Sequence, residues 1–169
     1  MAINFHSHFF DISKAFERAW YDGIIFRLHE ADTHLYISHW IADFLSDRYF
    51  AVQVTDQMSA RRHICAGVPQ GSCISPTLFC LYISSIADDL IRKFPQLKVA
   101  LYADDLCVWS TKRRKSELRI ALQEAIDEID SFCTEWCLDL CAAKSNYTIF
   151  TTAGFRNSYI RDFTRSRWP

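Results

Sequence analysis

Apolar and polar residues alternate at the start of the chain, and this alternation predicts a strand over residues 3–10. By the two-residue period, one face of the strand holds Phe5, Ser7, Phe9 and Asp11. Asp11 therefore lies at the C-terminal end of the strand. His6 and His8 share the opposite face, and a pair of histidines without a third ligand is more often packed or solvated than bound to a metal.

Apolar residues recur at helical spacing after Ser13, which predicts helices in the next part of the chain. The first helix has Phe16, Ala19, Trp20 and Ile24 on one face, with Gly23 as an interruption. A second helix is predicted over about 37–45. Residues 49–54 and 62–66 are predicted to form a hairpin, joined by polar residues around Asp56.

The stretch from Gly67 to Pro76 contains two of the chain's four glycines and two of its four prolines. Such a density of Gly and Pro favours one specific loop conformation. Ser75 is a good N-cap and Pro76 suits a first helical position, so the loop is predicted to open a helix. The apolar stripe of this helix is Phe79, Ile83, Ile86 and Leu90, and the helix is predicted to end before Pro95.

Two neighbouring carboxylates, Asp104 and Asp105, separate the short apolar runs 99–102 and 106–109, so they are predicted at the tip of a hairpin. Like charges held against partly buried strands repel each other unless cations neutralise them. Mg²⁺ suits such a site, because it is usually held by one or two carboxylates together with substrate phosphates. A bare Asp-Asp pair is nevertheless more often a solvated turn.

The last third of the chain continues with helix and strand patterns. The basic run Lys112–Lys115 is either a solvated loop or a phosphate contact. A long helix is predicted over about 116–136, and the short strands 138–140 and 147–150 flank Lys144. The arginine-containing segment 154–169 has no clear periodicity and is expected to be loose.

This order of elements predicts an α+β fold in one domain without an interdomain linker. We expect a mainly antiparallel sheet with helices on one face and a terminal hairpin. In such a sheet the strand ends that carry Asp11 and Asp104 are free to converge.

The chain has 169 residues, of which 50% are hydrophobic and 15% aromatic, which excludes a disordered protein. A formal charge of −1 gives no global basic surface, so nucleic-acid binding would need local patches and metal-bridged phosphates. The seven cysteines form no C-x-x-C pair, and we expect them to be reduced core thiols of an intracellular protein. We expect no signal peptide and no membrane span.

Four stretches of the sequence together resemble the palm motifs of reverse transcriptases. Their residues are most similar to the motifs of non-LTR (LINE-type) retrotransposons. The stretches are Phe10–Phe16, Gly67–Ser72 with Ser75 and Pro76, Tyr102–Asp105, and Lys144. Their order and spacing extend over about 140 of the 169 residues, and four ordered matches are far more specific than one. The resemblance implies a polymerase palm that copies an RNA template into DNA.

The resemblance also implies two Mg²⁺ ions, with Mn²⁺ as a substitute. Asp11 and Asp104 would be the paired metal ligands, Asp105 a less direct one, and the carbonyl of Ile12 would complete the nucleotide-side ion. The chemistry would be in-line addition of a deoxynucleotide to a primer 3′-hydroxyl. Lys144 resembles the general acid that protonates departing pyrophosphate, although its local sequence equally suits a surface lysine.

Three further residues are implied to line the nucleotide site. Phe16 matches the steric gate that excludes a ribose 2′-hydroxyl, while its spacing alone suggests an ordinary core residue. Gln70 and Gly71 match residues beside the nascent base pair, although a Pro-Gly loop can also simply turn the chain.

The sequence departs from the family pattern at several places. Glu17 replaces the usual Asp, and Cys141, Ala142 and Ala143 replace an Asn-Pro-like turn, which puts the position of Lys144 in doubt. We expect residues 1–153 to be a palm with fingers and thumb largely absent, and 154–169 a basic tail, as in a piece of a longer polyprotein. The implied partners are an RNA template, a DNA primer, deoxynucleoside triphosphates and the rest of that polyprotein, with no membrane and a nuclear location.

Two other functions stay open. A non-catalytic remnant could bind RNA or protein, but a remnant has no reason to keep three repelling carboxylates. Another palm-type nucleotidyl transferase or cyclase is the second alternative, and Phe16 and the Gln70-Gly71 loop argue against it.

Overall fold

The computed structural model describes residues 5–110, 115–151 and 154–159, and these divide into two compact units. The sheet unit joins Met1–Lys14 to Ser84–Pro169, and the helical unit is Ala15–Ile83. The sequence predicts one domain without a linker. In the sequence, the helical unit lies between the two segments of the sheet unit, and no change of composition marks the two points where the chain passes between them.

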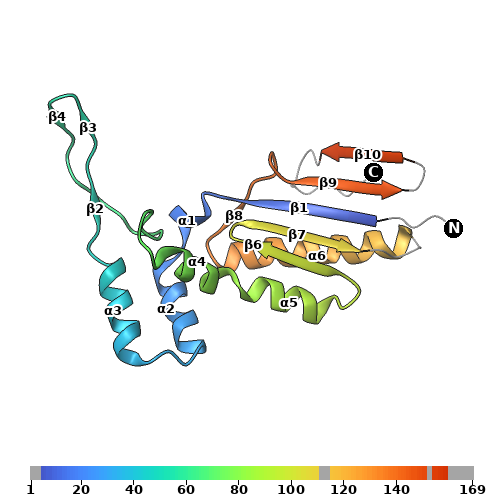
Figure 1. Ribbon diagram of the computed structural model, residues 1–169, viewed down its shortest axis with the longest axis horizontal. Coiled ribbons are helices and arrows are strands. Elements are labelled where there is room, and N and C mark those ends of the chain that lie inside the picture. The colour runs from blue at the N-terminus through green and yellow to red at the C-terminus, as the bar shows by residue number, and fades with distance from the viewer. Residues whose placement is uncertain (1–4, 111–114, 152–153, 160–169) are drawn as a thin grey trace. The chain divides into compact units, whose positions relative to one another are not determined.

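The sheet unit is built on an antiparallel sheet whose strands follow the order β10-β9-β1-β7-β6, with β8 also paired to β1 (Figure 1). Its strands are β1 Phe5–Ser13, β6 Lys98–Tyr102, β7 Asp105–Ser110, β8 Asp139–Leu140, β9 Asn146–Thr151 and β10 Gly154–Tyr159. Helix α5, Ser85–Lys93, packs beside β6, and helix α6, Lys115–Glu135, packs beside β8 and α5. The predicted α+β class with an antiparallel sheet is confirmed.

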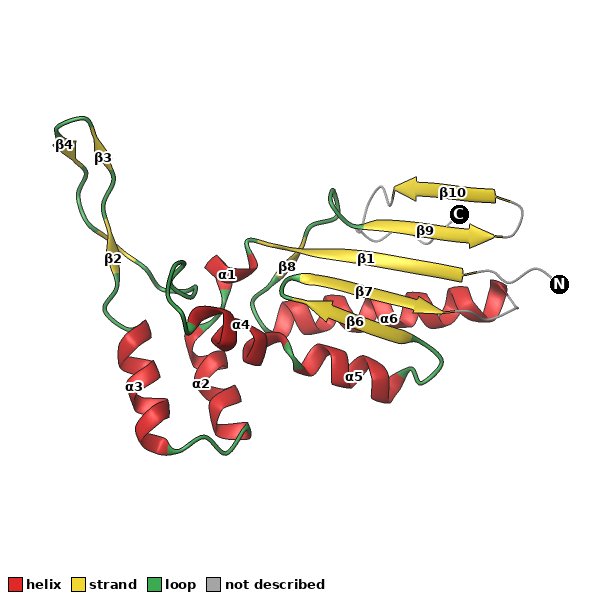
Figure 2. Cartoon of the chain, in the orientation of Figure 1, coloured by secondary structure: helices red, strands yellow, loops and turns green. Residues whose placement is uncertain are grey.

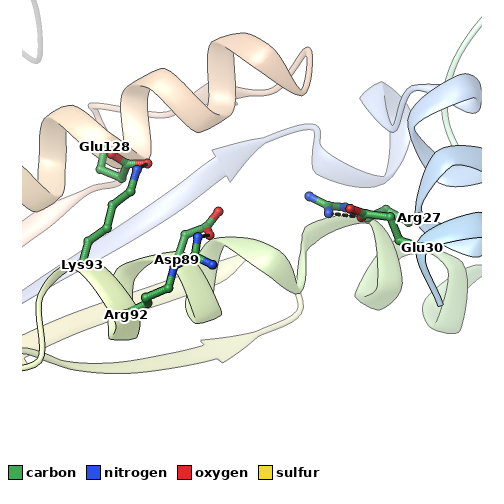
Figure 3. Close-up of polar contacts among 6 residues, drawn as sticks. All are labelled: Arg27, Glu30, Asp89, Arg92, Lys93 and Glu128. Atoms are coloured by element: carbon green, nitrogen blue, oxygen red, sulfur yellow. Dashed lines mark hydrogen bonds and ion pairs between the residues drawn. The ribbon is translucent and has the colours of Figure 1, made fainter.

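Alternate residues of the central strands are buried, as the two-residue period requires. Phe10 and Ile12 of β1 and Leu106 and Val108 of β7 are each at most 2% exposed. The apolar side of α6 adds Leu122, Ala125, Ile129 and Phe132 to the core, and Trp136 follows directly after the helix. An ion pair at 2.5 Å between Lys93 and Glu128 joins α5 to α6 (Figure 3).

The histidine pair of β1 belongs to this core. His6 and His8 are both buried, His6 Nδ1 is hydrogen-bonded to the hydroxyl of Tyr147, and the His8 ring lies 4.5 Å from the Tyr147 ring, centre to centre. Burial, reinforced by the neighbouring His6, lowers the pKa of His8 to about 3. The packed alternative for these histidines is therefore correct.

The helical unit contains four helices and a long two-stranded ribbon (Figure 2). The helices are α1 Ala15–Arg18, α2 Tyr21–Glu30, α3 Leu35–Leu45 and α4 Ser75–Ile83. Helix α2 packs against both α3 and α4, and its Arg27 is paired with Glu30 one turn later (Figure 3). In the ribbon, β2 Tyr49–Phe50 pairs with β5 Arg62–His63, and β3 Gln53–Val54 pairs with β4 Gln57–Met58.

Two predicted helices are each divided in the structure. The helix predicted after Ser13 is α1 and α2, separated at Ala19 and Trp20. The helix predicted from Ser75 is α4 and α5, separated at Ser84. Ser84 keeps helical dihedral angles (φ −56°, ψ −35°), so the sequence periodicity alone gives no sign of this break.

The C-terminal predictions also need correction. The short strands that flank Lys144 do not form a hairpin, because β8 and β9 each pair with β1. The segment expected to be loose begins with β10, which pairs with β9 and so satisfies backbone groups that β9 would otherwise leave open at a sheet edge. The rest of that segment, 160–169, and Lys112, Arg113 and Arg114 of the basic run lie outside the described residues.

The cysteines are all free, but only Cys133 is a core thiol. Burial raises its pKa to about 12. Cys65, Cys73, Cys80 and Cys137 are exposed, so the expectation of seven core thiols is wrong. Apolar neighbours in the sequence misled it, because a small thiol fits equally well on the outer face of an amphipathic element. Among the described residues, no helix is long and apolar enough to cross a membrane.

Candidate active site

The two neighbouring carboxylates lie at a tight turn between β6 and β7. Tyr102 and Asp105 are cross-strand partners, so Ala103 and Asp104 form the turn itself. Ala103 has a φ of 51°, the left-handed conformation that such a turn imposes. Asp104 is half-buried, whereas Asp105 is exposed as the first residue of β7. The predicted hairpin tip is confirmed.

Asp11 lies on the strand beside this turn. In the pairing of β1 with β7, Asp11 is the cross-strand partner of Asp105. Residues directly opposite each other in an antiparallel pair have Cβ atoms about 5 Å apart, so the two carboxylates share one small region. The predicted convergence of the acidic strand ends is therefore observed. One oxygen of Asp11, Oδ2, is buried and has no hydrogen-bond partner among the described residues.

The backbone of Asp11 is held by a segment distant in sequence. The Asp11 carbonyl accepts a hydrogen bond from Cys141 N at 2.8 Å, and Asp11 N donates to Ser145 Oγ at 3.4 Å. Ser145 is buried, and its hydroxyl donates to the Cys141 carbonyl at 2.9 Å. Sequence reasoning missed Ser145, for which the only signal is its place directly after Lys144.

Lys144 reaches the same carboxylate. A turn forms here, with Lys144 N donating to the Cys141 carbonyl at 3.1 Å, even though Cys141, Ala142 and Ala143 replace the family's usual turn residues. Lys144 Nζ lies 3.3 Å from Asp11 Oδ1. The lysine side chain is 69% exposed and that of Asp11 20%, so the ammonium group covers a carboxylate that is mostly withdrawn from water.

The donor set of this site suits Mg²⁺ or Mn²⁺. Asp11, Asp104 and Asp105 supply hard oxygen ligands, and the unpartnered Oδ2 of Asp11 is an acceptor whose burial calls for a cation or a donor. No group of three or more His, Cys, Asp or Glu side chains in the described ranges forms a self-contained metal site. Ile12 is only 2% exposed and buries its side chain, so it could contribute only its main chain.

Phe16 lies in the helical unit, on α1. Its side chain is half-buried, and its ring stacks on that of Phe79 with centroids 4.4 Å apart. The ring is thus held from one side by a fully buried aromatic residue of α4 and keeps part of its surface in contact with solvent. Both alternatives for Phe16, a core residue and a steric gate, are compatible with this arrangement, because the ring packs on Phe79 and also remains partly accessible.

The Gly-rich loop is bonded to the same short helix. Gly67 N donates to the Ala19 carbonyl and Val68 N to the Phe16 carbonyl, each at 2.8 Å. Gly67 has a φ of 87°, and a Cβ atom there would lie 2.6 Å from the carbonyl oxygen of Glu17. Only glycine fits this close approach. The loop and α1 therefore fix each other, and the Glu17 side chain is exposed.

Gln70 and Gly71 form the outer part of the loop. Both are exposed, and Gly71 has a φ of 91° with no atom within 4 Å of an added Cβ. The structure thus brings Phe16 and the base of this loop together in the helical unit. Asp11, Asp104, Asp105 and Lys144 are brought together in the sheet unit.

An antiparallel sheet carrying a carboxylate turn beside an acidic strand is the arrangement of a polymerase palm. The sequence also matches the reverse transcriptase (RNA-dependent DNA polymerase) family model over residues 5–160. The chain belongs to the reverse transcriptase family.

Relatives from fly transposons share this part of the sequence. The chain is 29% identical over 146 residues to a Drosophila melanogaster protein named "Probable RNA-directed DNA polymerase from transposon X-element", covering 86% of this chain and 16% of that protein. It is 31% identical over 155 residues to the RNA-directed DNA polymerase from mobile element jockey of the same organism, again covering 86% and 16%. The chain thus spans about one sixth of the length of these relatives.

The fold is also similar to solved structures of telomerase. The apo telomerase of Candida tropicalis, truncated from its C-terminal domain, superposes with a TM-score of 0.67 at 10% identity, covering 94% of this chain and 35% of that one. The telomerase of Candida albicans in complex with a fragment of telomeric RNA gives a TM-score of 0.59 at 12% identity, covering 83% and 27%. At this level of identity the similarity concerns the fold alone.

Proposed function

We propose that this chain is the palm of an RNA-directed DNA polymerase, which adds deoxynucleotides to a primer 3′-hydroxyl on an RNA template. The observation that carries the proposal is the pairing of Asp11 with Asp105 beside the Asp104 turn, with Asp11 Oδ2 buried and unpartnered. Asp11 and Asp105 carry like charges at directly opposed positions, and a bound cation would offset their repulsion. Family membership supplies the reaction class.

Asp11 and Asp104 would hold two Mg²⁺ ions, with Asp105 nearby and the Ile12 carbonyl as a further oxygen ligand. When bound, such ions lower the pKa of a hydroxyl nucleophile and stabilise charge on a leaving phosphate. The protein's own contribution is positional. Ser145 and the Cys141 amide fix the main chain of Asp11, so its carboxylate is presented in one orientation.

Lys144 would act as the general acid. Its Nζ lies 3.3 Å from Asp11 Oδ1, within reach of a phosphate that meets the same carboxylate through a cation. The ammonium group holds a proton that pyrophosphate needs as it departs, and its exposed position leaves the side chain free to move toward that group.

Phe16, Gln70 and Gly71 would contact the incoming nucleotide. The stacking contact with Phe79 holds the Phe16 ring in position. A ring fixed in this way excludes a ribose 2′-hydroxyl by steric clash. Because Gly67 bonds α1 to the loop, the exposed Gln70-Gly71 segment has a fixed base from which its backbone can approach a base pair.

The proposed partners are an RNA template, a DNA primer and deoxynucleoside triphosphates. The remainder of a longer polypeptide would supply fingers and thumb, because the matched relatives are about six times as long as the aligned segment. A nuclear location follows from the same proposal.

Metal-dependent melting is the first test. Ligand present at about 100 times its Kd stabilises the native state by about 2.7 kcal/mol. We expect Mn²⁺ to raise the Tm of the chain, and we expect Asp11→Asn and Asp104→Asn to abolish the increase. Asp130→Asn, an exposed aspartate of α6, is the matched control and should keep it. An equal increase in Tm for the wild type and all three variants would show that Asp11 and Asp104 do not form the metal site.

Primer extension is the second test. With an RNA template, a DNA primer and Mg²⁺, Asp104→Asn should reduce nucleotide addition by more than the roughly 10- to 100-fold that loss of an outer-shell partner costs. Conversion of free triphosphate without a primer would instead favour a cyclase.

A further inference from the structure

The ribbon of the helical unit is almost entirely exposed. All of its residues from Tyr49 to His63 are exposed except Ala51, which is half-buried. An isolated two-stranded ribbon is marginally stable in water, because it has no core of its own. Its persistence therefore depends on its base and on whatever its surface contacts.

The base of the ribbon is firmly attached. Arg48 donates to the Gly67 carbonyl at 2.6 Å and to the Tyr21 hydroxyl at 3.2 Å, and Ile64 N donates to the Arg48 carbonyl at 2.8 Å. These bonds secure both strands where they leave the helices. The ribbon is thus a supported projection of the helical unit.

Two aromatic rings lie beside the attached end, one on each face. Tyr49 is the cross-strand partner of His63, with ring centroids 5.0 Å apart, and Phe50 is the partner of Arg62. Tyr49 is 56% exposed and Phe50 48%. Because directly opposed residues share a face, each face combines an aromatic ring with a basic side chain.

The arginines here are available. Arg61 and Arg62 are exposed, and neither forms a hydrogen bond or ion pair with the described part of the chain. Arg92 of α5 is also exposed but is paired with Asp89 (Figure 3). Within residues 49–63 the acidic residue is Asp56, in the far turn between β3 and β4, and the exposed Asp47 precedes the attached end. The attached half is therefore locally basic in a chain whose net charge is −1.

We propose that the attached half of the ribbon, Tyr49–Phe50 with Arg61–His63, binds single-stranded nucleic acid. Free guanidinium groups contact phosphates, and exposed rings stack on unpaired bases, which is how single strands are bound without sequence preference. A protein partner would better explain exposed apolar side chains without basic neighbours, such as Val54 and Met58, and these lie in the far half of the ribbon. This binding adds a contact to the proposed polymerase and does not depend on catalysis.

Fluorescence anisotropy with a 5′-labelled oligouridylate of about 20 nucleotides tests the proposal, in EDTA and without nucleotides. Asp11→Asn is included, and unchanged binding by this variant separates the ribbon from the metal site. We expect Arg61→Gln/Arg62→Gln to weaken binding at least about fivefold and to reduce the slope of log K against log salt by about 1.4, near 0.7 per lost phosphate contact.

The matched charge control is Arg92→Gln/Lys93→Gln, two adjacent cations of α5 that already have ion-pair partners, and it should bind within twofold of the wild type. Arg61→Lys/Arg62→Lys keeps the charge and should retain most of the affinity. Tyr49→Leu/Phe50→Leu should weaken binding while leaving the salt slope unchanged, because stacking does not displace counterions. All of these positions are exposed, so unchanged Tm values will confirm that the variants fold.

Three results would overturn the proposal. The first is a failure of the wild-type protein to bind the oligouridylate. The second is equal affinity of the wild-type protein and the Arg61→Gln/Arg62→Gln variant. The third is ribbon variants that alter self-association in sedimentation while nucleic-acid affinity stays the same, because the ribbon would then be a protein contact.

Discussion

Lys144 Nζ lies 3.3 Å from Asp11 Oδ1, although 133 positions separate the two residues. The contact places a cation against the carboxylate proposed to bind metal. Under the proposed function, an ion held by Asp11 would displace this ammonium group and leave it free to meet a phosphate. Lys144 would then have a catalytic role in addition to the contact with Asp11.

Replacement of Lys144 by Gln should therefore affect turnover far more than stability. The pair is largely exposed on the lysine side, so its loss should change the free energy of unfolding by less than about 1 kcal/mol. Loss of a general acid should lower the rate of nucleotide addition by about 100-fold or more. Single-turnover kinetics and urea melts measure the two effects, and a rate within twofold of the wild type would exclude Lys144 as the acid.

Gly67 and Gly71 should differ in their tolerance of alanine. Gly67→Ala combines a φ of 87° with a Cβ atom 2.6 Å from a backbone oxygen, so we expect a loss of at least about 2 kcal/mol. Gly71→Ala meets no atom within 4 Å and should cost only the backbone strain, about 1 kcal/mol. Urea melts of the two variants measure the difference, and equal losses would show that the contact with Glu17 is unimportant.

His8 should make the protein less stable in mild acid. Its folded pKa, about 3, lies below the unfolded value of 6.5, so the unfolded state binds more protons between these pH values. Its contribution to stability is complete above pH 6.5 and falls by about 1.4 kcal/mol per pH unit below it. Unfolding free energies at pH 7 and pH 5 should thus differ by about 2 kcal/mol from this residue.

The control for this prediction is an exposed histidine. His8→Gln should flatten the pH dependence between pH 5 and 7, whereas His29→Gln on α2 should leave it as in the wild type. An unchanged slope in His8→Gln would mean that another group is responsible.

Phe16→Val should relax the choice of sugar. A smaller side chain at this position removes the collision with a 2′-hydroxyl, and one pocket group is worth about 10- to 200-fold in discrimination. We expect the ratio of ribonucleotide to deoxynucleotide addition to rise by at least about tenfold. The loss of the stack on Phe79 will also lower stability by about 1 kcal/mol. This loss does not change the measured ratio, because both nucleotides are compared on the same variant. An unchanged ratio would assign Phe16 to packing alone.

Local patterns predicted those parts of the fold that depend on neighbours in sequence. β1, the β6–β7 turn and α6 follow from two-residue or helical periodicity, and the convergence of Asp11 with the Asp104 turn follows from antiparallel pairing. The pairing of β8 and β9 with β1 does not follow, because strand partners separated by more than a hundred residues leave no mark in either segment.

The residues of the site also divide into those that local sequence patterns predict and those that they do not. Its carboxylates were predictable because paired charges between apolar runs are conspicuous. Ser145 was not, since a single serine looks the same whether its hydroxyl faces water or the backbone of Asp11. The break at Ser84 escaped prediction because the residue keeps helical dihedral angles.

The place of β1 in the middle of the sheet has a consequence for synthesis of the protein. Its partners β7 and β9 end at Ser110 and Thr151. At about 5–20 residues per second, roughly 7 to 28 s pass after the translation of β1 before both partners exist. The helical unit lies between them in sequence and can fold during that interval. A nascent chain should therefore acquire its helices first and rely on chaperones to shield an apolar strand that is made early and paired late.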